Sequence, residues 1–142
     1  MTVAADDEAL LHLRFPARAE RLKGVRGAVG EAAARCGCDA DAVRDVVIAV
    51  DVACQNVIRH AYGERSDGEV VLEIRRRGDA MVVDLRDFAE AVEPEKIKPR
   101  DLDDLRPGGL GTHFMREVMD SVEFLVPPQG RGNLLRMVKR IS

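Results

Sequence analysis

Apolar residues recur along this chain with two different periods, and each change of period predicts a new element. Residues 10–15 (LLHLRF) alternate loosely and are followed by Pro16, which predicts a first strand. From Ala17 the apolar residues recur at helical spacing, and Gly37 is the expected end of this first helix. The chain therefore opens with a strand followed by an amphipathic helix.

Three glycines, Gly24, Gly27 and Gly30, lie inside this first helix. Each costs about 1 kcal/mol relative to alanine in a helix interior, so their presence needs a reason. We interpret them as a flat strip against which another element packs closely, with a partner-binding seam as the alternative.

A second helix is predicted from Asp39 or Asp41 to about Ala61. Both aspartates are favourable N-cap residues, and their charge suits the positive end of a helix. Ile48 and Val52 lie opposite the main apolar arc, so we expect this helix to be covered on two sides. The main arc consists of Val43, Val46, Val47, Val50, Ala53, Cys54, Val57 and Ile58.

The pattern switches to period two in the middle of the chain. Residues 69–76 and 80–85 predict the two strands of a hairpin, joined by a turn at 77–79. Residues 88–107 are rich in charge and proline and have no sustained apolar period, apart from one short helical turn at 94–98. A stretch of this length without a pattern is usually functional or mobile.

A third helix is predicted to start at Gly108, Gly109 and Gly111, and strands at 122–126 and 134–141 complete the order. Strands grouped in hairpins with helices between them predict an α+β fold. We expect a two-layer sandwich in which a mixed, mainly antiparallel sheet carries its helices on one face. The 142 residues are expected to form a single domain.

Composition and charge narrow the class of protein. Hydrophobic residues make up 46% of the chain and charged residues 33%, which excludes disorder, collagen and coiled coil as the main architecture. The formal net charge of −3 argues against a DNA-coating protein, so no direct nucleic-acid contact is expected. No apolar run approaches a membrane span, and the opening sequence MTVAADDEAL is acidic where a signal peptide would be basic. We expect a cytoplasmic protein without membrane contact.

The chain has three cysteines, Cys36, Cys38 and Cys54. An odd number without a second closely spaced pair fits neither a disulfide framework nor a tetrahedral zinc site. We expect reduced, structural thiols, because disulfides are rare in the cytosol.

Three features carry candidate chemistry. The small residues before the third helix expose backbone N–H groups at its start, which makes an anion site or a plain helix entry. Asn56 lies inside the second helix, where asparagine is unfavourable, so it is either a magnesium ligand or a partner in a core hydrogen bond. Asp87 ends a strand as a ligand or a turn former. The glycines match neither a Rossmann fingerprint nor a Walker A loop.

Four sequence blocks follow one another along nearly the whole chain: IAVDVACQNVIRHAYG at 48–63, LRDFAEAV at 85–92, PGGLGTHFMREVMDSVEF at 107–124 and GNLLRMVKR at 132–140. In this order they resemble the anti-sigma-factor serine kinases of the GHKL superfamily, histidine-kinase-like ATPases with the Bergerat fold. The resemblance implies that the chain binds Mg-ATP, holds a sigma factor and phosphorylates a serine of a STAS-domain antagonist. It also implies a partner-switching role in transcription regulation and a possible homodimer.

The resemblance also assigns roles to individual residues. Asn56 would hold the Mg²⁺ that bridges the phosphates, with Arg59 and His60 near the phosphates or structurally behind them. Asp87 would accept a hydrogen bond from the adenine amino group, and residues 88–107 would form the ATP lid. Gly109, Leu110 and Gly111 would match the glycine box whose backbone wraps the triphosphate, with Gly108 and Thr112 as further nucleotide-binding residues.

Several residues depart from the family pattern. The family's general base is a glutamate four residues before the asparagine, where this chain has Val52, which cannot accept a proton. Asp51 is about 140° around the helix from Asn56, so it is a weak candidate base and is more readily read as a solvated or locally paired carboxylate. Ala89 replaces a glycine near the purine, where its methyl group is either tolerated or crowds the nucleotide. Arg106 is a candidate phosphate contact, although Pro107 separates it from the glycines.

Three functions remain open from the sequence. The first is an anti-sigma factor and serine/threonine kinase with weakened catalysis. The second is a non-catalytic binding module that sequesters its partner without phosphoryl transfer. The third is a detached ATP-binding domain of a histidine-kinase or phosphatase pathway.

Overall fold

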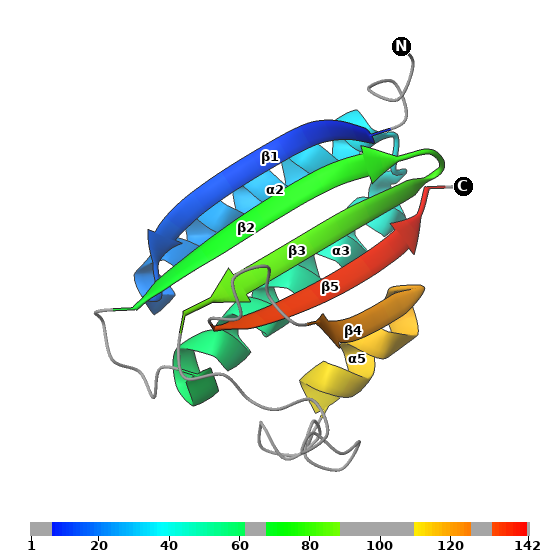
Figure 1. Ribbon diagram of the computed structural model, residues 1–142. Coiled ribbons are helices and arrows are strands. Elements are labelled where there is room, and N and C mark those ends of the chain that lie inside the picture. The colour runs from blue at the N-terminus through cyan, green and yellow to red at the C-terminus, as the bar shows by residue number, and fades with distance from the viewer. Residues whose placement is uncertain (1–6, 62–67, 89–109, 126–131, 142) are drawn as a thin grey trace.

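A five-stranded sheet with its helices on one face forms the body of the protein in the computed structural model, which describes residues 7–61, 68–88, 110–125 and 132–141 (Figure 1). The strands are β1 (Asp7–Pro16), β2 (Glu69–Arg77), β3 (Ala80–Asp87), β4 (Ser121–Leu125) and β5 (Asn133–Arg140). The helices are α2 (Leu22–Cys36), α3 (Ala40–Asn56) and α5 (Leu110–Val118), with a 3-10 turn η1 (Ala19–Arg21) and a π-helical turn η2 (Val57–Ala61).

The sheet has the order β1-β2-β3-β5-β4, and every pairing among these strands is antiparallel. The predicted α+β class and the helices on one face are therefore confirmed. The expected mixed sheet is antiparallel throughout in the described strands. The predicted helical turn at 94–98 and nearly all of the 88–107 stretch lie outside the described residues.

Local capping chemistry sets the ends of the two long helices. Gly37 has φ 107°, the left-handed conformation that ends α2, and the Cys38 N–H donates to the Ala33 carbonyl at 3.1 Å. Asp39 then caps α3, because its carboxylate accepts a hydrogen bond from the Ala42 N–H at 2.8 Å. The residues between the helices therefore end one and start the next.

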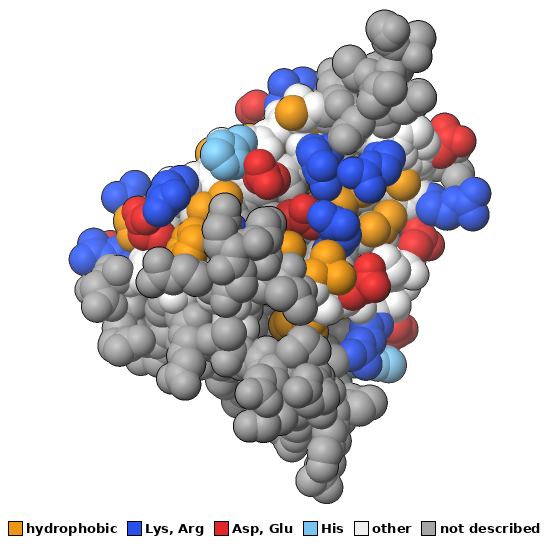
Figure 2. Space-filling model, in the orientation of Figure 1, with side chains coloured by type: hydrophobic (Ala, Val, Ile, Leu, Met, Phe, Trp, Pro, Cys, Tyr) orange, Lys and Arg blue, Asp and Glu red, His pale blue; other side chains and the backbone are white. Residues whose placement is uncertain are grey.

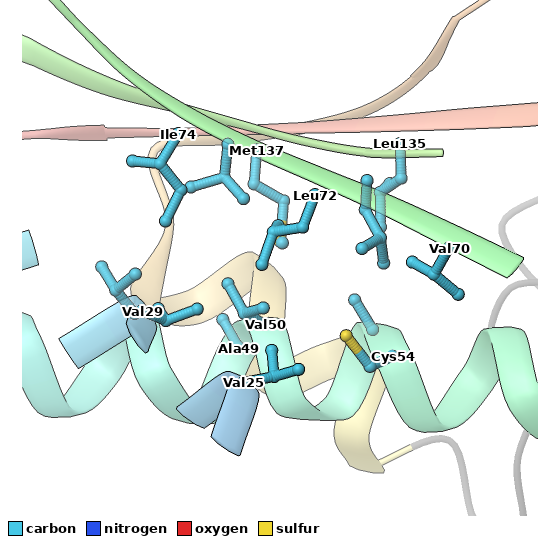
Figure 3. Packing of buried hydrophobic residues seen from close by; sticks show 14 of the residues in the cluster. Val25, Val29, Ala49, Val50, Cys54, Val70, Leu72, Ile74, Leu135 and Met137 are labelled. Atoms are coloured by element: carbon cyan, nitrogen blue, oxygen red, sulfur yellow. The ribbon is translucent and has the colours of Figure 1, made fainter. Parts of the chain in front are cut away.

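The core lies between the sheet and helices α2 and α3 (Figure 3). Val25 and Val29 project from α2, and Val50 and Cys54 project from α3, toward the inward-facing side chains of β2 and β5. The labelled sheet residues on this side are Val70, Leu72, Ile74, Leu135 and Met137. Alternating burial along β2 follows from the period of two that the sequence shows there.

The side of α3 that carries Ile48 and Val52 is less covered than the sequence predicts. Ile48 is 40% exposed, so the prediction that α3 is covered on two sides is wrong at this position. Val52 is half-buried and packs against the edge of the core. Helical periodicity places the two residues on one side but does not say which neighbour reaches them.

The three glycines of α2 differ in their surroundings. A methyl group on Gly30 would meet Val47 Cγ2 at 3.6 Å, so close packing against α3 explains this residue. Methyl groups on Gly24 and Gly27 would meet no described atom within 4 Å. The packing-strip interpretation is therefore wrong for Gly24 and Gly27.

Gly27→Ala is expected to raise the free energy of unfolding by about 0.5–1 kcal/mol, because alanine lowers the backbone entropy of the unfolded chain and fits the open space. Urea denaturation measures the change. Gly37→Ala is the opposite control, since a side chain at φ 107° is strained and should lower stability. An unchanged or lower stability in Gly27→Ala would contradict this account of the helix.

The strand pairing at the β1 edge of the sheet is irregular at one point. The pairing of β1 with β2 shifts between Ala9 and Leu11, which leaves Leu10 in a bulge. Arg35 on α2 donates from Nη2 to the Leu10 carbonyl at 2.8 Å. A side chain of α2 therefore bonds to the backbone at this bulge.

The cysteines are not bonded to one another, and none of the described helices combines the length and apolar character of a membrane span. Burial, reinforced by the charge of Asp51, raises the pKa of Cys54 to about 12. The pKa of Cys38 is also raised, chiefly by burial. Both thiols are therefore poor nucleophiles at neutral pH.

Candidate functional site

The C-terminal end of α3 holds two residues of the predicted site on one side of the helix. Val52 and Asn56 are four positions apart, so their side chains lie one above the other. Asn56 is the last residue of α3, is half-buried, and makes no side-chain hydrogen bond within the described part of the chain. The π turn η2 follows at once and carries the exposed Arg59. Such turns often occur at functional sites.

Asp51 does not face the same side as Val52 and Asn56 but makes contacts with α2 and along α3. Its Oδ1 accepts a hydrogen bond from Arg26 Nη1 of α2 at 3.0 Å, and its Oδ2 accepts one from Gln55 Nε2 at 2.8 Å. The Asp51 side chain is only 17% exposed in this arrangement. Both carboxylate oxygens are thus engaged in joining α3 to α2 and in a contact along α3.

The end of β3 places a buried carboxylate on the helix-facing side of the sheet. Asp87 is 4% exposed, and in the sheet it lies directly between Val70 of β2 and Asn133 of β5. Residues opposite one another in antiparallel strands share a face, so Asp87 faces the helices as Val70 does. Asn133 donates from Nδ2 to Asp87 Oδ1 at 2.9 Å, which fixes the orientation of this carboxylate.

Gly132 packs directly against the backbone of Asp87. It has φ +80°, and a methyl group there would lie 1.9 Å from the Asp87 carbonyl oxygen and 2.9 Å from Phe88 Cα. Only glycine fits both the conformation and the space. The start of β5 is therefore built around the backbone of Asp87.

The C-terminal end of α3, with Val52 and Asn56, and the end of β3, with Asp87, lie at the same end of the molecule. Val70, the strand neighbour of Asp87, lies above Cys54 of α3 in Figure 3. Asp87 thus ends its strand over the part of α3 that carries Val52 and Asn56. Helix α5 packs beside α3, and its first residues lie toward this end of α3 in Figure 1. The free N–H groups of a helix start favour anions, so this end suits a phosphate-bearing ligand.

A sequence model of the histidine kinase-like ATPase domain matches residues 15–139. The chain belongs to the histidine kinase-like ATPase family. The fold expected from the resemblance is thereby confirmed for almost the whole chain.

Similar proteins carry the name serine-protein kinase RsbW. The protein of Bacillus velezensis is 31% identical over 122 residues, which cover 80% of this chain and 76% of that protein. The protein of Halalkalibacterium halodurans is 33% identical over 139 residues, which cover 91% of this chain and 82% of that protein. The protein of Staphylococcus aureus is 28% identical over 142 residues, which cover 94% and 89% of the two chains.

Some predicted site residues of this ATPase domain lie outside the described part of the chain. They are Ala89, Arg106, Gly108 and Gly109. The backbone of Leu110, Gly111 and Thr112 forms the first turn of α5, and His60 lies in η2. Leu110, Gly111, Thr112 and His60 therefore lie at the start of α5 and just after α3, where a ligand is expected. The roles of all these residues remain predictions.

Two residues of this end received no role from the sequence. Gly132 and Asn133 open the last of the four sequence blocks, but their contact with Asp87 depends on the pairing of β3 with β5. A polar residue directly after glycine at the start of the strand is the only local signal. We expect Asn133 to position the Asp87 carboxylate.

The donor set around Asn56 suits magnesium held mainly by a ligand. Within the described residues, no three His, Cys, Asp or Glu side chains are grouped closely enough to hold a metal ion. Mg²⁺ usually keeps several waters and binds through one or two protein oxygens together with substrate phosphates. One half-buried amide fits that requirement.

Proposed function

We propose that this chain is an ATP-binding anti-sigma regulatory factor of the serine/threonine kinase type in which phosphoryl transfer is weakened. The observation that carries the proposal is the side of α3 on which Val52 lies one turn before Asn56. An isopropyl group stands where the base of this kinase type would take the proton of the attacking serine hydroxyl. The nearby carboxylate of Asp51 is engaged by Arg26 and Gln55, so it does not replace that base.

The nucleotide is proposed to bind between α3, the end of β3 and the start of α5. Asp87 accepts a hydrogen bond from the adenine amino group, and Asn133 orients its carboxylate. Asn56 supplies an oxygen to Mg²⁺, which when bound would neutralise phosphate charge. The backbone of residues 108–112 contacts the phosphates, with Arg59, His60 and Arg106 as further candidate contacts. Residues 88–107 act as the lid over the nucleotide.

The partners are proposed from the resemblance to anti-sigma-factor kinases. The chain holds a sigma factor, and a STAS-domain antagonist displaces that factor and offers the serine that accepts the phosphoryl group. The protein acts in the cytoplasm, with a homodimer as its proposed assembly. Serine as the acceptor agrees with the relatives' name, serine-protein kinase.

A second candidate is a non-catalytic module that controls its partner by occlusion alone. The same observation favours it, because neither Val52 nor the paired Asp51 offers a free base. The two candidates differ in whether a phosphoryl group reaches the antagonist. Phosphoryl transfer depends heavily on positioning and charge, so slow residual transfer fits the first candidate.

Mg-ATP is expected to stabilise the natural chain in a thermal-shift experiment, and Asp87→Asn is expected to lose most of that effect. A ligand at one hundred times its dissociation constant adds roughly 2.7 kcal/mol to the free energy of unfolding. An amide at position 87 removes one charge-assisted acceptor, which is worth about 1.5–3 kcal/mol, or roughly tenfold to a hundredfold in affinity.

Asp79→Asn is the matched control, because it makes the same chemical change in the exposed turn at the other end of β3. It should bind Mg-ATP as the natural chain does. No shift of the natural chain at millimolar Mg-ATP would sink the nucleotide proposal. Equal shifts in the two aspartate variants would remove Asp87 from the site.

A further inference from the structure

Asn133 is the first residue of β5, and its side chain lies on the helix side of the sheet. Leu135, two residues later, faces the helices in Figure 3, and side chains two apart on a strand share a face. Asn133 is half-buried and is the direct strand partner of Asp87. Its amide therefore lies on the side of the sheet where the nucleotide is proposed to bind.

The backbone fixes the position of Asn133 relative to Asp87. The pairing of β3 with β5 runs without a shift from Ala80 opposite Arg140 to Asp87 opposite Asn133. Gly132, the residue before Asn133, packs so closely that a methyl group there would lie 2.9 Å from the Asp87 carbonyl carbon. The asparagine side chain is short, so its amide stays within reach of the carboxylate opposite.

The two buried carboxylates of β3 are held in different ways. Asp84 lies on the outer face of the sheet, where it accepts from Arg136 Nε at 2.7 Å and from Arg136 Nη2 at 2.9 Å. Figure 2 shows acidic and basic side chains lying among one another on that face. Asp87 accepts from Asn133 Nδ2 at 2.9 Å, and this amide adds no charge. Asn133 thus orients the Asp87 carboxylate without cancelling the negative charge that attracts a donor.

The direction of the hydrogen bond from Asn133 bears on what Asp87 can bind. An ionised carboxylate only accepts hydrogen bonds, so the amide presents its N–H group to it. Adenine carries an amino group at position 6 of the purine, which donates, whereas hypoxanthine and guanine carry an oxygen there. A carboxylate oriented toward this position favours a 6-aminopurine and repels a 6-oxopurine. Sites built around one polar group reject an analogue that lacks its partner.

We propose that Asn133 is a positioning residue that makes the site selective for 6-aminopurine nucleotides, because it holds the Asp87 carboxylate toward the base. This inference rests on the proposed nucleotide function of the same site. Asn133 acts through Asp87, so its effect depends on the amino group of the base. The triphosphate contacts are common to all purine nucleotides, and loss of Asn133 should therefore weaken binding of ATP more than binding of a 6-oxopurine nucleotide.

The test compares binding of Mg-ATP and of magnesium inosine triphosphate to the full chain by isothermal titration calorimetry. Inosine triphosphate has an oxygen in place of the 6-amino group and the same ribose and phosphates. The natural chain should prefer ATP by at least about tenfold. Asn133→Leu removes the donor at similar size and should reduce this preference to about threefold or less, chiefly by weakening ATP binding. Asn133→Ala makes the same deletion with a smaller side chain and serves if the leucine variant does not fold.

Two further variants separate positioning from a general loss of structure. Asn133→Thr keeps a hydroxyl donor on a residue type that favours strands, and it should retain most of the preference for ATP. Gln55→Leu deletes another amide donor to a carboxylate, the 2.8 Å hydrogen bond from Gln55 Nε2 to Asp51 Oδ2. It should leave the preference within about twofold of the natural chain, because this contact is remote from the base.

The outcomes distinguish this inference from the proposed function. If Asn133→Leu and Asn133→Ala keep the full preference, or weaken both nucleotides equally, the inference is overturned while nucleotide binding stands. A natural chain that binds both nucleotides alike, or an equal fall in preference in Gln55→Leu, overturns it as well. A natural chain that binds neither nucleotide refutes the proposed function, and this inference with it.

Discussion

Val52→Glu is expected to raise the rate of phosphoryl transfer from ATP to a STAS-domain antagonist by roughly 10²–10⁴-fold, the usual contribution of a general base. The reason is geometric, because position 52 lies one helical turn from Asn56 on the same side of α3. A carboxylate there would face the phosphates whose metal ion Asn56 is proposed to hold. The rate is measured with labelled ATP, magnesium and a STAS-domain antagonist as the phosphoryl acceptor.

Val52→Gln separates the proton-accepting role from the change of size and polarity. Glutamine has the shape of glutamate but cannot take a proton at neutral pH. Val52 packs against the core, so both variants should lose some stability, and both are checked by thermal melting. Equal rates in the natural chain and Val52→Glu, or equal gains with glutamine and glutamate, would refute the account of the base.

Among the glycine substitutions considered, Gly132→Ala is expected to lower the free energy of unfolding the most, by roughly 2–4 kcal/mol. It combines a strained backbone with a direct clash. Its methyl group would lie 1.9 Å from the Asp87 carbonyl oxygen, so β3 or β5 must move. The displaced Asp87 carboxylate should also weaken Mg-ATP binding. Urea denaturation and the thermal-shift assay measure the two effects.

Gly78→Ala provides the comparison. Gly78 has φ +60°, but a methyl group there meets no described atom within 4 Å. It therefore has the backbone strain without the clash, and should cost only about 1–2 kcal/mol. If Gly132→Ala loses no more stability than Gly78→Ala, the close contact of Gly132 with the Asp87 backbone does not determine the stability of the fold.

Features that depend on neighbouring residues were predictable from the sequence. The Asp39 cap, the Gly37 end of α2 and the alternation of β2 each follow from chemistry within one or two turns or strand periods. The shared side of Val52 and Asn56 follows from helix geometry alone. The sequence therefore predicted the main elements, the fold class and the placement of Val52 and Asn56 on one side of α3.

Contacts between distant segments were not predictable in the same way. Asn133 and Asp87 are 46 positions apart, and their hydrogen bond needs the register of β3 with β5. Arg26 and Asp51 are 25 positions apart and meet only because α2 packs on α3. The exposure of Ile48 depends on which element covers it, which no periodic pattern specifies.

The bulge at Leu10 has a consequence for the protein at high concentration. An unprotected outer strand invites the strands of other molecules to add to it, which leads to aggregation. Here the irregular pairing and the Arg35 guanidinium block that addition on one side of the sheet, and the five-residue β4 offers little length on the other. Both edges of the described sheet therefore resist the addition of strands from other molecules.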